Sequence, residues 1–217
     1  MILKYYGHAF FTWTLENGTV IAHDPYGEFY EYPLRSVKAD YCLVSHHHHD
    51  HDGISSLKPG TVIIDEGGKH HLENDISIQR VPTWHDEVQG AKRGPNTIWI
   101  IEAEGMRVGH AGDLGHVPDA KQAKQIGHLD VLLLPVGGYY TIDPKEAIET
   151  CRLLQPSVVV PMHYRTRYDE EMPVAGVEEF LKLVKAENAQ MPLVRFAKAD
   201  LMERPPVITL AIQPREK

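Results

Sequence analysis

The stretch Tyr41–Gly53 reads YCLVSHHHHDHDG. It joins a short apolar run to five histidines within six residues. The apolar run at 41–44 predicts a buried strand, and the histidines follow its carboxyl end, where α/β folds commonly place their sites. Side chains two positions apart in an extended chain face the same way, so His46 and His48 can bind one metal ion. Imidazole ligands suit zinc, and also manganese or iron.

The second half of the same run offers a further pair of ligands. Asp50 and His51 stand at the start of the next turn and can face a second metal ion beside the first. His47 and His49 are expected to point the other way and to be dispensable for metal binding. The alternative is a solvated histidine cluster, but this run is internal and directly follows an apolar segment. We therefore predict an ordered metal centre.

Composition predicts an ordinary globular protein. The 217 residues suit one domain, 1–217, and the hydrophobic (42%) and charged (24%) fractions are typical of soluble chains. No apolar run reaches the roughly eighteen residues of a membrane helix, and the N-terminus is predicted to form a strand, not a signal peptide. The net charge of −8 makes nucleic acid an unexpected partner. Cys42 and Cys151 fit reduced, buried thiols and a cytoplasmic location.

Apolar runs and turn residues predict strands in the first part of the chain and alternating strands and helices later. The expected strands are 3–6, 9–15, 19–23, 41–44, 61–65, 76–81, 97–103, 106–110, 130–138, 157–161, 193–197 and 206–213. The expected helices are about 119–126, 144–154 and 177–187. Asp143 and Glu146 form a capping box with Pro144 in the first turn. This order predicts an α/β fold in which two packed sheets carry helices outside.

The pattern H-x-H-x-D-H after a strand resembles the signature of the metallo-β-lactamase superfamily. Three later segments resemble further family segments in the family's order: VPTWHDEVQGAKRGPN, RVGHAGDLG and VVVPMHY. The resemblance implies an αββα sandwich of two mixed sheets with two metal sites. It implies a first site of His46, His48 and His85, a second of Asp50, His51 and His163, and a bridging Asp113.

Within the superfamily, the segments YYGHAFF and DVLLLPVGG are similar to the small stand-alone hydrolases that include L-ascorbate-6-phosphate lactonase-like proteins. That likeness implies two divalent ions, zinc with manganese or iron as alternatives, which lower the pKa of a shared water from about 15.7 toward about 7. Asp50 and Asp113 would act in catalysis as ligands. The expected reaction is hydrolysis of an ester-like bond, first a lactone, in a small anionic substrate. The alternatives are a phosphodiesterase or nuclease, an iron-dependent oxidoreductase and a non-catalytic metal-binding protein, and no oligomeric state is predicted.

Each residue beside these motifs has two possible roles, one in the site and one in the structure. His8 follows the first strand and is either an acid or substrate contact at the rim, or a structural histidine. His110 and His116 bracket the predicted bridging aspartate and either orient ligands or simply pack. Asp24, in HDPYG, resembles a family aspartate near the site, and a turn-forming Asp-Pro is the alternative.

Two later segments are candidates for substrate contacts. The first is the run Gly137–Tyr140, which precedes a helix start that favours an anionic group, with a tight turn as the alternative. The second is Tyr164 and Arg165, which are candidates for oxyanion or phosphate contacts.

Overall fold

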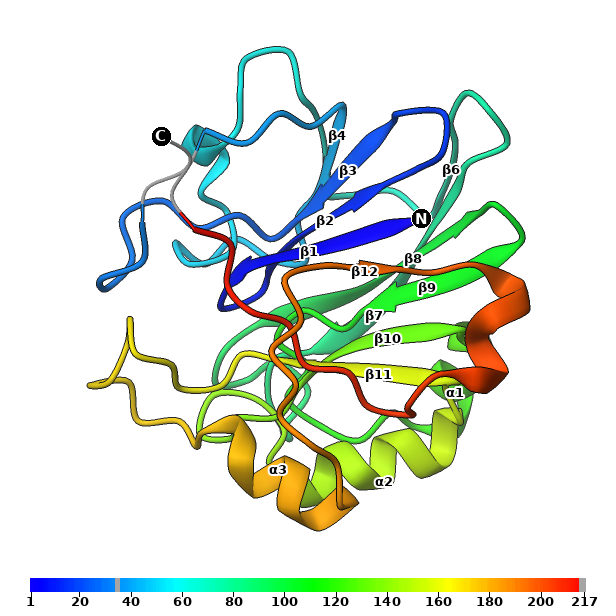
Figure 1. The fold of residues 1–217 in the computed structure, drawn as a ribbon. Coiled ribbons are helices and arrows are strands. Elements are labelled where there is room, and N and C mark those ends of the chain that lie inside the picture. The colour runs from blue at the N-terminus through cyan, green and yellow to red at the C-terminus, as the bar shows by residue number, and fades with distance from the viewer. Residues whose placement is uncertain (34–35, 215–217) are drawn as a thin grey trace.

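The structure, a computed structural model that describes residues 1–33 and 36–214, stacks two six-stranded sheets face to face (Figure 1). The first sheet has the order β12 (Val194–Arg195), β1 (Ile2–Gly7), β2 (Phe10–Thr14), β3 (Val20–His23), β4 (Tyr41–Leu43) and β5 (Val62–Ile64). The second has the order β11 (Val158–Met162), β10 (Val131–Pro135), β9 (Met106–His110), β8 (Pro95–Ala103), β7 (Ser77–Trp84) and β6 (Lys69–His71). The predicted fold class is confirmed.

Strand direction brings the functional segments to one edge of the sandwich. Strands β3, β4 and β5 run parallel in the first sheet, as do β9, β10 and β11 in the second. Strand β7 points the same way as β9, because each is antiparallel to the β8 strand between them. The segments that follow β4, β7, β9 and β11 therefore start from the carboxyl ends of their strands, and these are the four segments singled out by their histidines and aspartates.

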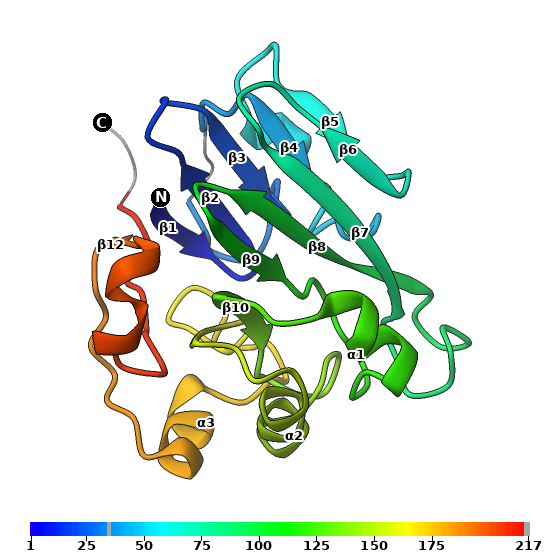
Figure 2. The same cartoon turned by 90° about the vertical axis from the view of Figure 1, so that its right-hand side faces the viewer.

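The two outer faces are covered differently. The helices α1 (Ala120–Ile126), α2 (Pro144–Leu154) and α3 (Val177–Val184) lie on the side of the second sheet (Figures 1 and 2). On the first sheet, alternate strand residues join a separate apolar cluster with the loop between β3 and β4; it includes Tyr6, Phe10, Ala22, Tyr26, Phe29, Tyr32 and Cys42. A loop thus performs there the burial that helices perform on the other side.

Apolar burial between the sheets holds the strand ends in place. Trp13 of the first sheet and Trp99 of the second are both buried in the main core. Each fully buried large apolar side chain of this kind contributes roughly 1.5–3 kcal/mol. The indole Nε1 of Trp99 also donates to the Val44 carbonyl at 2.9 Å, so the end of β4 is tied to the second sheet just before the histidine run.

Most predicted elements are present, including the Asp143 capping box of α2, but one strand was missed and two expected strands differ. Strand β6 was not predicted, because its residues are polar. The expected strand 130–138 ends at Pro135, before the turn at Gly138, whose φ is +66°. The segment 206–213 makes only isolated bridges, to Val159 of one sheet, to Tyr5 of the other and to Met191, because it crosses between the sheets. No helix in the described ranges is long and apolar enough to cross a membrane.

Candidate metal centre

Histidines and aspartates from five strand ends converge at this edge in three overlapping groups that could each hold a metal ion. Within each group the ligand atoms lie within 4.8 Å of one another. The groups are His46, His48 and His85; then His8, Asp50, His51 and His163; and then His46, His51 and Asp113. The structure therefore brings together every residue of the two expected ligand sets and adds His8 to the second.

Asp113 lies between the two expected sets. Its Oδ2 is 3.0 Å from the Nε2 of His85 and 3.3 Å from that of His163. Its Oδ1 is 3.0 Å from the Nε2 of His51. One carboxylate thus faces ligands of both sets, as a bridging group must.

The position of Asp113 depends on Asn96, which the sequence did not single out because it lies inside a strand. The Asn96 Oδ1 accepts the Asp113 backbone N–H at 2.9 Å, and its Nδ2 donates to the Ala111 carbonyl at 2.9 Å. Between them Gly112 has a φ of +54°, and a Cβ there would lie 2.4 Å from the Asn96 Oδ1. Only glycine allows this close approach.

Asp24 lies buried beneath the cluster, in agreement with its family resemblance. Its carboxylate accepts the Ser45 backbone N–H at 2.7 Å, the Ser45 hydroxyl at 2.6 Å and His51 Nδ1 at 2.9 Å. Burial raises the pKa of Asp24, but the imidazoles of His110 and His51 outweigh it and bring that pKa to about 2. The ionised carboxylate fixes the proton of His51 on Nδ1, which leaves Nε2 facing Asp113.

His8 is fully buried behind the cluster, so its expected place at the rim is wrong. It follows Gly7 in a left-handed turn, and its Nε2 lies 3.2 Å from the Asp50 Oδ2. Its ring centroid lies 4.1 Å from that of His163, whose backbone N–H donates to the His8 carbonyl. Burial, aided by His163, lowers the pKa of His8 to about 4, so the imidazole is neutral.

The other histidines near the motifs support loops. His110 donates from Nε2 to the Ala9 carbonyl at 2.9 Å, stacks on His23 and lies 3.8 Å from Asp24. His116 accepts the Trp84 backbone N–H at 3.3 Å. Neither belongs to a group that could hold a metal ion. His110 Nδ1 accepts the Gly112 backbone N–H at 3.1 Å, one residue before Asp113, which agrees with the orienting alternative, whereas the contacts of His116 agree with the packing alternative.

His47 and His49, the two histidines expected to point away from the metal site, lie in different surroundings. His47 is exposed and pairs through Nδ1 with Asp52 at 2.7 Å, as expected of a residue that points away. His49 is also exposed, but it lines the cavity over the cluster, which corrects the expectation that it points away. Neither belongs to a group that could hold a metal ion.

A cavity of about 450 Å³ opens over the cluster, within the size range of small-ligand sites. What we call the histidine wall comes from the motif segments and comprises His48, His49, Asp50, His85, Asp113 and His163. The loop wall comprises Glu28, Phe29, Tyr30, Arg93, Tyr140 and Met172. A larger depression of about 1060 Å³ elsewhere is lined by Glu16, Glu102 and Asp130 and includes none of the clustered side chains.

The two later candidate segments have different outcomes. Tyr140 lines the cavity, and three residues earlier the backbone passes so close to His163 that a Cβ at Gly137 would lie 2.2 Å from the His163 carbonyl oxygen. The adjacent start of α2 offers no anion site, because the Asp143 carboxylate already accepts its backbone N–H groups. Tyr164 and Arg165 line a separate depression of about 370 Å³, so their assignment as contacts of this site is wrong.

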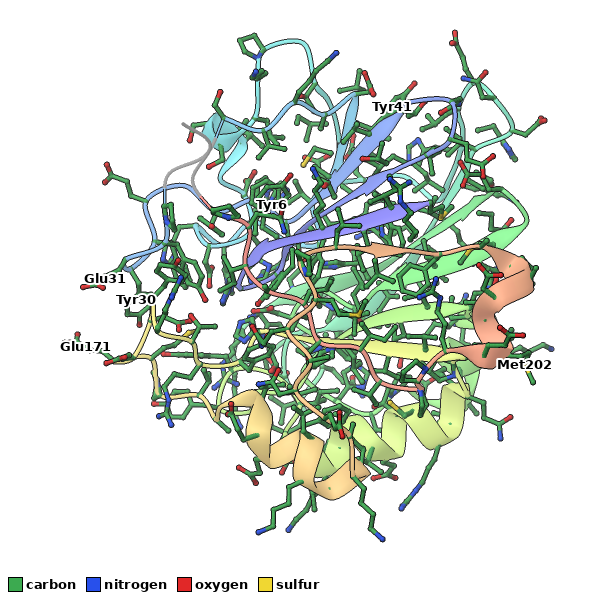
Figure 3. All side chains as sticks on the ribbon, in the orientation of Figure 1. Tyr6, Tyr30, Glu31, Tyr41, Glu171 and Met202 are labelled. Atoms are coloured by element: carbon green, nitrogen blue, oxygen red, sulfur yellow. The ribbon has the colours of Figure 1, made fainter. Side chains whose placement is uncertain are left out.

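Sequence reasoning missed most of the loop wall. Phe29 and Tyr30 belong to the irregular loop between β3 and β4, whose tip carries Tyr30 next to Glu31 in Figure 3. The Glu31 backbone N–H donates to the Tyr168 carbonyl, which joins this loop to the segment that contributes Met172. No local motif marks these residues. For Arg93 there was one signal in the sequence. Asp86, an acidic residue directly after His85 and shortly before Gly90, indicates a loop held by its own carboxylate.

Poorly satisfied buried atoms test whether the cluster fits a metal. His51 Nε2, His163 Nε2 and Asp113 Oδ1 are buried and make no well-aligned hydrogen bond among the described residues, although the two imidazole nitrogens lie only 3.0 Å and 3.3 Å from the Asp113 carboxylate. An unsatisfied buried polar group costs about 1–3 kcal/mol, and more if charged. Imidazole nitrogens and carboxylate oxygens are the ligands that zinc and related ions take. A bound cation would satisfy these atoms, so the residues fit it.

Comparisons with known proteins agree with the fold and the site. The family model described as "Beta-lactamase superfamily domain" matches residues 2–163. A "UPF0173 metal-dependent hydrolase" of Thermococcus onnurineus is 34% identical in an alignment 173 positions long that covers 68% of this chain and 75% of the relative. One from Archaeoglobus fulgidus is 30% identical in an alignment 226 positions long, gaps included, that covers 89% of this chain and 95% of the relative. A crystal structure from Thermotoga maritima, proposed to be a Zn-dependent hydrolase of the metallo-beta-lactamase superfamily, is 35% identical with a TM-score of 0.81, covering 98% of this chain and 99% of that one.

Proposed function

Since the chain belongs to the beta-lactamase superfamily and, within it, to the UPF0173 metal-dependent hydrolase family, we propose that it is a dinuclear hydrolase of ester-like bonds. We infer a lactone as the first substrate class, in a small anionic molecule, and zinc as the metal. The observation that carries the proposal is the position of Asp113 between two groups of clustered ligands.

Each ligand set has a defined place in this proposal. His46, His48 and His85 would hold one ion, Asp50, His51 and His163 the other, and Asp113 would contact both. When bound, the ions would supply an activated water at neutral pH and polarise the attacked carbonyl. Asp24 keeps His51 in the tautomer that a ligand needs. His8 packs against Asp50 and His163 and would hold both in place.

The cysteines support a mechanism without a thiol nucleophile. Burial raises the pKa of Cys42 well above its usual value and that of Cys151 to about 12. Both thiols therefore stay protonated at neutral pH, and a protonated buried thiol is a poor nucleophile. Neither cysteine lines the cavity over the cluster. No serine, threonine or cysteine is among the described residues that line the cavity, which supports water as the source of the nucleophile.

Metal content and a substrate panel test this function together. Elemental analysis of the purified protein should find about two metal ions per chain. The metal-loaded protein is then assayed against lactones, phosphodiesters and thioesters, with lactone hydrolysis expected. His48→Ala should lose metal and activity, while the adjacent, exposed His47→Ala serves as the matched control. Hydrolysis of phosphodiesters alone would replace the lactone assignment, and a single iron with oxygen consumption would replace hydrolysis.

A further inference from the structure

The loop wall of the cavity contains one strongly basic side chain. Among the described residues that line the cavity, Arg93 is the one lysine or arginine. Its Nη2 donates to the Tyr139 carbonyl at 3.0 Å, and its guanidinium carbon lies 5.7 Å from the centre of the Tyr140 ring. Neither partner carries a charge. A guanidinium has five N–H donors, so most of them remain for a ligand.

The buried acidic side chain of the same loop, Asp86, is occupied with the loop's own backbone. Its buried carboxylate accepts the backbone N–H groups of Val88 at 2.9 Å, Gly90 at 2.7 Å, Lys92 at 2.9 Å and Arg93 at 2.7 Å. This ring of hydrogen bonds fixes the loop from the residue after His85 to the backbone of Arg93. The guanidinium is therefore held near the cluster without being neutralised by this carboxylate.

The neighbouring lysine shows the contrast. Lys92 is exposed, and its Nζ forms an ion pair with Glu87 on the outside of the loop. It is not among the residues that line the cavity. The same loop thus presents one cation to solvent in an ion pair, and one to the cavity that makes no ion pair among the described residues.

We propose that Arg93 binds an oxyanion, a carboxylate or a phosphate, carried by the substrate whose other end reaches the clustered histidines. The guanidinium matches both groups, because its parallel N–H donors fit two oxygens at once. The aromatic rings of Phe29 and Tyr140 would flank the part of the molecule between its two ends. This inference rests on the proposed hydrolase function for the identity of the ligand as a substrate, but binding itself requires no turnover.

Calorimetric titration of the metal-loaded protein tests the proposal with three probes of similar length: succinate, 3-phosphonopropionate and butyrate. The two dianions can engage both the metal-loaded cluster and Arg93, whereas butyrate has a single carboxylate, which the metal-loaded cluster is expected to bind. The wild-type protein should bind at least one dianion about 10- to 100-fold more tightly than butyrate, the range of one charge-assisted contact. A preference for 3-phosphonopropionate would identify a phosphate group, and a preference for succinate a carboxylate.

Three variants test whether the preference for dianions depends on Arg93. Arg93→Met should abolish the preference for dianions while leaving butyrate binding and metal content unchanged. Arg93→Lys keeps the charge but loses the paired donors, so it should retain only part of the preference. Lys92→Met, the matched control, should behave like the wild type. Equal binding of all three probes by the wild type, or a full preference in Arg93→Met, would overturn the proposal.

The outcome is separable from that of the proposed function. If the protein bears no hydrolase activity but Arg93→Met still loses the preference, the anion site stands and the reaction is wrong. If lactones are hydrolysed but the preference is insensitive to Arg93, the reaction stands and the anion site is wrong. The thermal unfolding temperature of Arg93→Met should match that of the wild type. If it does not, the partial loss of the dianion preference in Arg93→Lys tests the proposal instead.

Discussion

The two walls of the cavity differ in how the chain builds them. The histidine wall comes from residues placed directly after strands, and buried hydrogen bonds such as those of Asp24 and Asn96 hold it. The loop wall comes from irregular segments whose side chains are partly exposed, such as Tyr30 and Tyr140. A reaction type that depends on fixed ligands belongs to the first wall, while the choice of substrate belongs to the second.

The largest effect should come from Asp113, the carboxylate that contacts both ligand sets. Asp113→Ala is expected to lose bound metal and to reduce hydrolysis to background, because both sets lose the group between them. Elemental analysis and the hydrolysis rate measure this. Asp52→Ala removes a half-buried carboxylate of the same region that belongs to no group of clustered ligands, and it should change neither value. A variant of Asp113 with two metals and a wild-type rate would rule out its bridging position.

A smaller effect is expected one layer below the histidine wall. Asp24→Asn keeps the shape but removes the charged acceptor of His51 Nδ1. Loss of such a supporting carboxylate typically costs about 10- to 100-fold in metal affinity or activity. Competition with a metal chelator measures the affinity directly. Unchanged affinity in a folded variant would show that the histidine wall does not depend on this carboxylate.

A change in the loop wall should affect substrate binding and spare the metals. Tyr140→Ala removes an aromatic face that lines the cavity and contacts the Arg93 guanidinium. One aromatic contact with a cation contributes about 0.5–2 kcal/mol, so we expect KM to rise about 3- to 30-fold with metal content unchanged. Tyr139→Ala is the matched control, because Tyr139 is 65% exposed and lies outside the lining. Metal loss in Tyr140→Ala would show that the walls are not independent.

The smallest effects on metal content are expected from substitution of His47 and His49. His47→Ala removes an exposed pair with Asp52, and such surface pairs contribute about 0–1 kcal/mol. His49→Ala should also keep both metals, although its position in the cavity allows a small change in KM. Metal analysis of the two variants beside His46→Ala checks the assignment. A lost metal in His47→Ala would contradict the division of the run by position.

Most of the histidine wall, His49 excepted, could be predicted because its members follow strands whose apolar pattern is local. The ligand candidates His85, Asp113 and His163 stand in recognisable segments at strand ends, and parallel strands necessarily bring such ends together. The exact surroundings were not predictable in the same way. His8 and Tyr164 also follow strands, yet one lies behind the cluster and the other in the core beside Tyr5. Which side of a strand end faces the site depends on the turn that follows it.

Apolar periodicity and the spacing of the histidine run are short-range properties, so they predicted the two-sheet class, most strands and helices, and the ligand candidates of the run, while the family resemblance added His85, Asp113 and His163. The loop wall, the support by Asp24 and Asn96, and the place of Arg93 in the cavity became apparent only in the folded chain. These contacts join residues far apart in the chain, such as Tyr32 and Asp169. Long-range contacts of irregular segments follow no sequence period, so they exist only once the two sheets have packed.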